Sequence, residues 1–172
     1  MREAELEPPP ARTARWSWIA SFIRVDWPKG THQPKALQLA LAAITAISGS
    51  LVVCIVVATL GARVFAFSAK IPRFQFSSYS LPTIVVIAIA CAVWPVATWV
   101  SSRGSRFFLC IITVATAMTI AADLWIFNRN QPGAIGAVAV AMHVGIAVVT
   151  YVSLVLVAPQ WPRPEPRYFE DY

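Results

Sequence analysis

Four long stretches of the chain are almost free of charged residues and are separated by short polar segments. A membrane-spanning helix needs about 20 consecutive, mostly apolar residues. The pattern therefore predicts an all-α membrane protein in which residues 36–158 form a four-transmembrane-helix bundle. The predicted spans are 36–60, 82–100, 107–127 and 134–158.

The composition supports this class and argues against enzymes. Hydrophobic residues make up 58% of the 172 residues and charged residues only 13%, whereas a typical soluble domain has about 25% charged residues. The sequence has no glycine-rich phosphate loop, no G-x-S-x-G motif and no metal-ligand spacing. A bis-histidine haem is excluded because a single histidine lies in a span. We therefore expect no enzymatic activity, no catalytic residue, no cofactor and no metal.

The segments that flank the spans have their own patterns. Residues 1–13 are acidic and then proline-rich, which predicts a disordered tail. Residues 14–35 are predicted to form an amphipathic interfacial helix, which anchors on the membrane surface, and a linker. Residues 159–172 are predicted to form a proline-rich cytoplasmic tail. The apolar face of the interfacial helix consists of Trp16, Ile19, Ile23 and Trp27.

The distribution of basic residues predicts the orientation. An even number of spans places both chain ends on one side of the membrane. Ten of the 14 Lys and Arg residues lie on that side, and four lie on the other. The positive-inside rule then places the N- and C-termini in the cytoplasm. The net charge of +6 suits anionic lipid headgroups better than nucleic acid, for which the flanks are too short to form a folded module.

Two ionisable side chains interrupt the last two spans. At a rise of 1.5 Å per residue, Asp123 lies about 6 Å below the end of the third span, and His143 lies about 14 Å inside the fourth. At that depth we expect His143 to face Thr116 and Thr119 rather than Asp123 itself. A water or a threonine hydroxyl would then bridge the two ionisable groups.

These four residues, which form the candidate polar site, have two interpretations. Asp, Thr and His side chains together are suited to a proton relay in a membrane. Alternatively, His143 hydrogen-bonds a threonine or a backbone carbonyl and fixes helix register, while Asp123 makes a polar contact near the helix end. The sequence leaves both interpretations open.

Small residues recur at every fourth position in two spans. Such rows let helices approach closely in lipid. We expect these rows to pack inside the bundle, with contact to a second copy of the chain as the alternative. The rows are Gly133, Ala137, Ala141 and Gly145 in the fourth span, and Ala42, Ala46 and Ser50 in the first.

Aromatic residues near the ends of the spans predict the two membrane–water interfaces. Pro95 is expected to kink the second span. The loop 63–81 is the largest external surface, and its aromatic residues are expected either in strand-like pieces or in the outer interface. The predicted inner belt consists of Trp94, Trp99, Phe107, Phe108 and Trp161, and the outer belt of Tyr79, Trp125 and Phe127.

The order of these elements resembles a known family. The second span opens near Pro82, and the fourth span contains AVAMHVGIAVV, with Met142 followed by His143 early in it. Over residues 36–158 the chain is similar to a family of small bacterial four-helix integral membrane proteins of unknown function. The resemblance implies a multi-pass protein in the plasma membrane (the inner membrane) of a bacterium, and it implies no activity.

Two functions are consistent with these patterns. The first is a non-catalytic accessory or interaction subunit, which uses the outer loop, the small-residue rows and the tails. The alternative is a small proton- or ion-coupled transporter or conduit that uses Asp123 and His143. The expected partners are a bilayer with anionic headgroups and a protein partner or homo-oligomer, and no nucleic acid.

Overall fold

The computed structural model describes residues 33–65, 75–101, 103–130 and 133–160, with the backbone alone for 126–130. These residues form four helices that are long and apolar enough to cross a membrane, so the prediction of an all-helical, multi-pass membrane protein is confirmed. The predicted interfacial helix and residues 1–13 lie outside the described residues. The helices are α2 (Ala36–Val64), α3 (Phe76–Val100), α4 (Gly104–Asn130) and α5 (Gly133–Val157).

The helices extend further than the apolar stretches. In particular, α3 begins at Phe76, so Pro82 lies inside the helix. From residue 76 onward the loop 63–81 is therefore helical and not strand-like. Similarly, α4 continues to Asn130, beyond the predicted end at residue 127. A backbone entering the membrane must satisfy its own hydrogen bonds, and the helical form therefore persists past the last strongly apolar residue.

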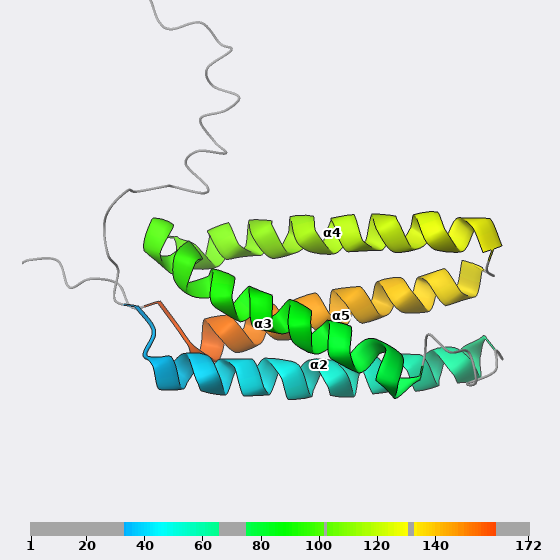
Figure 1. The fold of residues 1–172 in the computed structure, drawn as a ribbon, viewed down its shortest axis with the longest axis horizontal. Helices are drawn as coiled ribbons and strands as arrows, with labels where there is room; N and C mark the ends of the chain where they lie inside the picture. The colour runs from blue at the N-terminus through cyan, green and yellow to red at the C-terminus, as the bar shows by residue number, and fades with distance from the viewer. Residues whose placement is uncertain (1–32, 66–74, 102, 131–132, 161–172) are drawn as a thin grey trace, which may run out of the picture.

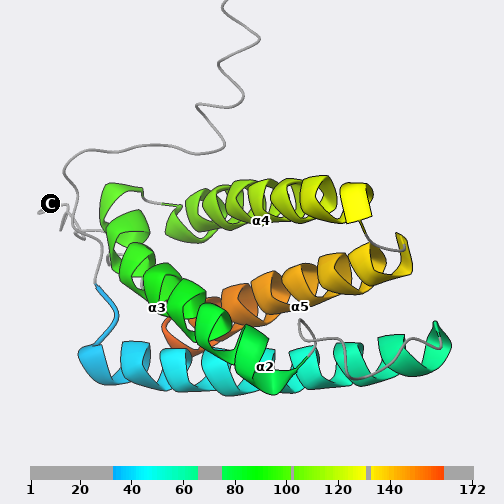
Figure 2. The same ribbon diagram turned by 45° about the vertical axis from the view of Figure 1, so that its right-hand side comes forward.

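The helices are arranged around α5. Helix α5 runs antiparallel to α2, with which it makes the most extensive contact, and α4 packs on its other side. Helix α3 crosses obliquely from α2 at one end of the bundle to α4 at the other (Figures 1 and 2). The start of α2, the end of α5 and the α3–α4 connection share one end, which we call the terminal end. The opposite end is the loop end. Which end faces the cytoplasm stays a prediction.

Small residues allow α2 to approach α5. The predicted row in α2 is confirmed, because Ala42, Ala46 and Ser50 are fully buried and Gly61 continues the buried face. A Cβ atom at Gly61 would lie 2.5 Å from Cγ2 of Val138 on α5. Apolar burial gives little driving force between helices in lipid, and small residues let the backbones approach closely enough for van der Waals packing.

The small-residue row of α5 behaves differently. Gly145 lies at the α2 contact, where an added Cβ would be 2.5 Å from Cγ1 of Val53. Gly133, Ala137 and Ala141 are exposed and do not pack inside the bundle. A step of four residues rotates about 40° past one full turn, so the row turns through about 120° between Gly133 and Gly145. Its contact with a second copy stays a prediction.

The terminal end contains an aromatic cluster. Trp94 and Phe108, predicted at the interface, are each only 1% exposed, so that prediction is wrong for both. The Trp94 Nε1–H donates to the Ala158 carbonyl at 3.0 Å, and its ring meets Phe108 edge-on at 5.1 Å. Phe108 in turn stacks on Tyr151. A carbonyl just past α5 has no partner within the helix, and this gives the buried indole its acceptor.

Gln160 ties the terminal end together. Its Oε1 accepts the backbone N–H of Gly104 at 3.0 Å, and its Nε2 donates to the Ser101 carbonyl at 3.1 Å. The Thr98 hydroxyl donates to Oε1 of Gln33 at 3.3 Å. These bonds join the end of α5, the α3–α4 connection and the segment before α2. Gln160, predicted in the tail, therefore belongs to the bundle.

Candidate functional site

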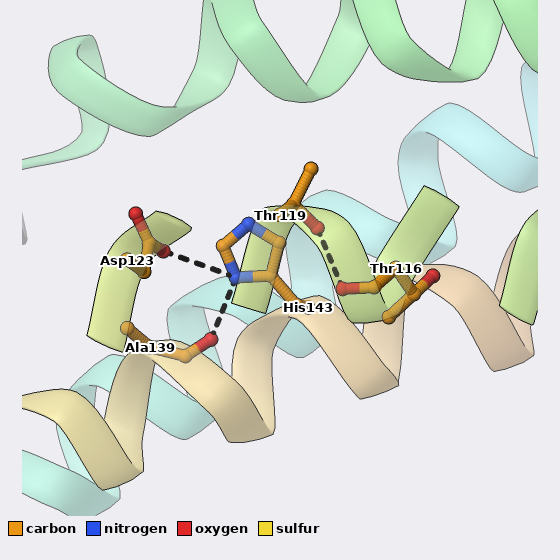
Figure 3. Close-up of polar contacts among 5 residues, drawn as sticks. All are labelled: Thr116, Thr119, Asp123, Ala139 and His143. Atoms are coloured by element: carbon orange, nitrogen blue, oxygen red, sulfur yellow. Dashed lines mark hydrogen bonds and ion pairs between the residues drawn. The ribbon is translucent and has the colours of Figure 1, made fainter. Parts of the chain in front are cut away.

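His143 on α5 and Asp123 on α4 are in direct contact. The His143 Nδ1 lies 3.5 Å from the Asp123 Oδ2 (Figure 3). Their side chains are 32% and 28% exposed. The prediction that His143 faces the threonines rather than Asp123 is therefore wrong.

The direction of helical side chains explains the contact. Asp123 lies about 10 Å from the end of α4 at Asn130 and His143 about 15 Å from the start of α5 at Gly133, at 1.5 Å per residue. Helical side chains tilt toward the N-terminus of their own helix. Because α4 and α5 are antiparallel neighbours, the Asp123 side chain points deeper into the bundle and the His143 side chain points back toward the loop end. The two opposite tilts bring the carboxyl group of Asp123 and the imidazole of His143 to the same depth.

The backbone determines which nitrogen of His143 carries the proton. The Nδ1 atom also lies 2.9 Å from the Ala139 carbonyl (Figure 3). A carbonyl oxygen and a carboxylate oxygen both accept hydrogen bonds, so Nδ1 must be the donor. In the neutral ring the lone pair is then on Nε2. The imidazole therefore offers a donor to Asp123 and an acceptor on its opposite side.

Thr116 and Thr119 do not link the two ionisable groups. The Thr119 hydroxyl donates to the Thr116 carbonyl of its own helix at 2.9 Å (Figure 3). Within the described ranges, neither threonine has a hydrogen bond to His143 or Asp123. The expected bridge is thus replaced by the direct contact, and the two threonines line the space beside it.

That space is a cavity of about 230 Å³ between α3, α4 and α5. Most of its wall is aliphatic. On the part of the chain that the structure describes, the Nε2 atom of His143 has no hydrogen-bond partner. The hydroxyl of Thr150, which is 2% exposed, also has none. The polar residues of the wall are Thr83, Thr116, Thr119, His143 and Thr150.

Sequence reasoning missed this cavity because the path of α3 creates it. The oblique crossing carries the middle of α3 away from α4 (Figure 2). Residues of α3, α4 and α5 line the cavity. Thr83 and Thr150 were the available signals, since each places a hydroxyl at a buried position of an apolar helix. Hydroxyls in such positions mark helix contacts more often than cavities, so these signals alone do not identify a site.

Across the described ranges, no three His, Cys, Asp or Glu side chains gather closely enough to hold a metal ion. The expectation that the protein uses no metal and no cofactor stays a prediction. The ionisable groups of the candidate site are His143 and Asp123.

Comparison with protein-family models, with curated proteins and with solved structures finds no match to this chain. The resemblance to a bacterial membrane-protein family, and with it the bacterial plasma membrane, therefore stays a prediction.

Proposed function

We propose that this chain is a small proton-coupled membrane transporter in which His143 and Asp123 form the proton-binding site. The observation that supports the proposal is the 3.5 Å contact between Nδ1 and Oδ2 inside two adjoining spans. Ionisable side chains within membrane spans are costly and rare, and they commonly serve ion or proton pathways. A contact that only fixed helix register would need a hydrogen bond but no titratable group.

The two imidazole nitrogens give the proton a direction. Nε2 accepts a proton from a hydronium ion on the cavity side, which leaves water, and Nδ1 then releases its own proton to Oδ2 of Asp123. The O–H bond of the hydronium ion and the Nδ1–H bond break, while an Nε2–H bond and an O–H bond on the carboxyl group form. Histidine is the side chain whose charge changes most readily near neutral pH. The step therefore moves a proton from the cavity toward the loop end.

The aromatic cluster closes the other side of the pathway. The cavity is bounded toward the terminal end by Phe108, which is buried against Trp94 and Tyr151. A proton that crosses the whole membrane therefore requires these rings to rearrange. This arrangement favours a carrier, which changes conformation in each cycle, over an open channel.

Proton flux into liposomes tests this function. The full-length protein is reconstituted with an internal pH-sensitive dye, and a potassium diffusion potential drives proton entry. We expect Asp123→Asn and His143→Gln to lower the flux to that of protein-free vesicles while circular dichroism stays unchanged. Thr59→Val is the matched control, because this hydroxyl lies on α2 outside the cavity wall and donates only to carbonyls of its own helix. Equal flux in all four proteins, or no wild-type flux above empty vesicles, would reject the proposal.

A second candidate is the accessory or interaction subunit. The observation that favours it is that the other helices cover α4 poorly. In the most apolar 18-residue stretch of α4, 6% of the residues are buried, against 33% in that of α3. Lipid also covers such a face, so the direct test is the mass of the complex extracted gently from its native membrane. A stoichiometric foreign subunit would support this function, whereas a monomer or homo-oligomer would count against it.

A further inference from the structure

The cavity beside His143 has the construction of a ligand site. Its walls are apolar, and few polar groups reach into it, as in most small-molecule sites. Its volume of about 230 Å³ is below the roughly 300–1,000 Å³ of sites for drug-sized molecules. The cavity therefore accommodates one narrow chain, or part of one, and excludes a bulky headgroup.

The cavity opens within the membrane-spanning part of the bundle. Val86 and Ile89 on α3 line it, and they are 54% and 59% exposed. Ala115 on α4 lines it from the opposite side and is also exposed. Exposed residues in the middle of a span face lipid. A ligand therefore enters sideways from the bilayer, and it is a lipophilic molecule.

The polar end of the site selects the head of that molecule. The acceptor Nε2 of His143 requires a head that donates a hydrogen bond. Asp123 lies directly behind the imidazole, and its carboxylate repels an anionic head. His143 also lies about 15 Å along α5, a depth at which a charged headgroup would have to leave its water. These three conditions together select an uncharged donor.

We propose that the cavity between α3, α4 and α5 binds an uncharged, single-chain lipid with one hydroxyl group, which donates its hydrogen bond to Nε2 of His143. The inference deepens the proposed function and rests on it, since it names the class of molecule that occupies the proton-accepting side of the imidazole. A neutral lipid alcohol meets the polarity, the depth and the width of the site.

Thr150 is the rival anchor within the same cavity. Its hydroxyl has no partner among the described residues, and it lies about 10 Å further along α5. However, Thr150 is only 2% exposed, whereas the His143 side chain is about a third exposed. A head that enters from the bilayer therefore reaches the imidazole. This difference predicts which of the two substitutions removes recognition of the hydroxyl.

Photolabelling with three matched probes tests the inference. The wild-type protein in liposomes is labelled with a 16-carbon alcohol, a 16-carbon fatty acid and a 16-carbon alkane, each with the same diazirine in the chain. Mass spectrometry locates the labelled residues. We expect the alcohol to label cavity residues about fivefold more than the alkane, the effect of roughly one hydrogen bond. We expect the fatty acid to label no better than the alkane, and unlabelled hexadecanol to compete.

Two pairs of variants assign the label. Ala115→Phe fills the cavity and should lower labelling at least tenfold, whereas Ala121→Phe, at an exposed alanine of α4 outside the cavity wall, should leave it unchanged. His143→Phe should reduce the alcohol to the level of the alkane, and Thr150→Val should not. Equal labelling by alkane and alcohol, preference for the fatty acid, or loss of preference in Thr150→Val alone would each overturn the inference.

The same proteins separate this inference from the proposed function. Ala115→Phe leaves both members of the proton-binding pair in place. Specific alcohol labelling in a protein without proton flux would reject the transporter and keep the lipid site. Flux that depends on His143 in a protein that no alcohol labels would keep the transporter and reject the lipid site.

Discussion

Gly61 on α2 faces Val138 on α5 so closely that a single methyl group added at Gly61 would lie 2.5 Å from Cγ2 of the valine. The same closeness recurs between Gly145 and Val53, about 12 Å away along α2 at 1.5 Å per residue. The two contacts fix the register of α2 against α5. Register in turn determines where α5 presents His143 to α4.

The first prediction concerns this packing. Gly61→Ala should destabilise the bundle by about 1–3 kcal/mol, as overpacking does in a close-packed interior. Valine is branched at Cβ and has few alternative rotamers, so it cannot easily move aside. Thermal unfolding in detergent measures the effect. Gly133→Ala is the matched control, because nothing lies within 4 Å of its Cβ position and alanine is the better helix former.

A double variant tests the cause of that loss. Val138→Ala removes both methyl groups that the new Cβ would meet. We expect Gly61→Ala combined with Val138→Ala to be more stable than the sum of the two single effects predicts. Strict additivity would show that the glycine is needed for a reason other than the contact with Val138.

The second prediction concerns Trp94 and the end of α5. Trp94→Phe keeps an aromatic ring but removes the donor to the Ala158 carbonyl, and it should cost about 0.5–1.5 kcal/mol. Trp94→Ala also removes the ring that packs against Phe108 and should lower the free energy of unfolding by about 3–5 kcal/mol. Thermal unfolding of both variants checks the order. Equal losses would mean that the hydrogen bond, and not the ring packing, accounts for the whole effect.

The third prediction concerns Gln160 at the terminal end. Gln160→Ala removes the acceptor of the Gly104 N–H and the donor to the Ser101 carbonyl. We expect a loss of about 1–3 kcal/mol, because a partner of buried backbone groups disappears. Hydrogen exchange at the Gly104 amide should become faster than in the wild type. Unchanged exchange at this amide would contradict the assigned contact.

The membrane-spanning helices and the ionisable pair differ in how far the sequence predicts them. The four spans follow from apolar length, because a single segment in lipid satisfies all its backbone hydrogen bonds within itself only as a helix. The contact between Asp123 and His143 does not follow from depth alone, because it depends on side-chain tilt and on the true end of α4 at Asn130. Similarly, a tryptophan near a span end can lie either at the membrane interface or in the core. Trp94 lies in the core because the Ala158 carbonyl accepts the hydrogen bond of its indole N–H.

The last prediction concerns the protonation of His143. Because Nδ1 faces the Ala139 carbonyl and Asp123, the neutral imidazole should carry its hydrogen on Nδ1, and Nε2 should be unprotonated. Nitrogen-15 NMR of the reconstituted protein distinguishes the two tautomers, and the substitution His32→Gln leaves His143 as the one labelled histidine of the chain. In Asp123→Asn the Ala139 carbonyl alone should hold the same tautomer. A neutral ring with its hydrogen on Nε2 would remove the acceptor from the cavity, and with it both the direction of proton transfer and the recognition of a lipid hydroxyl.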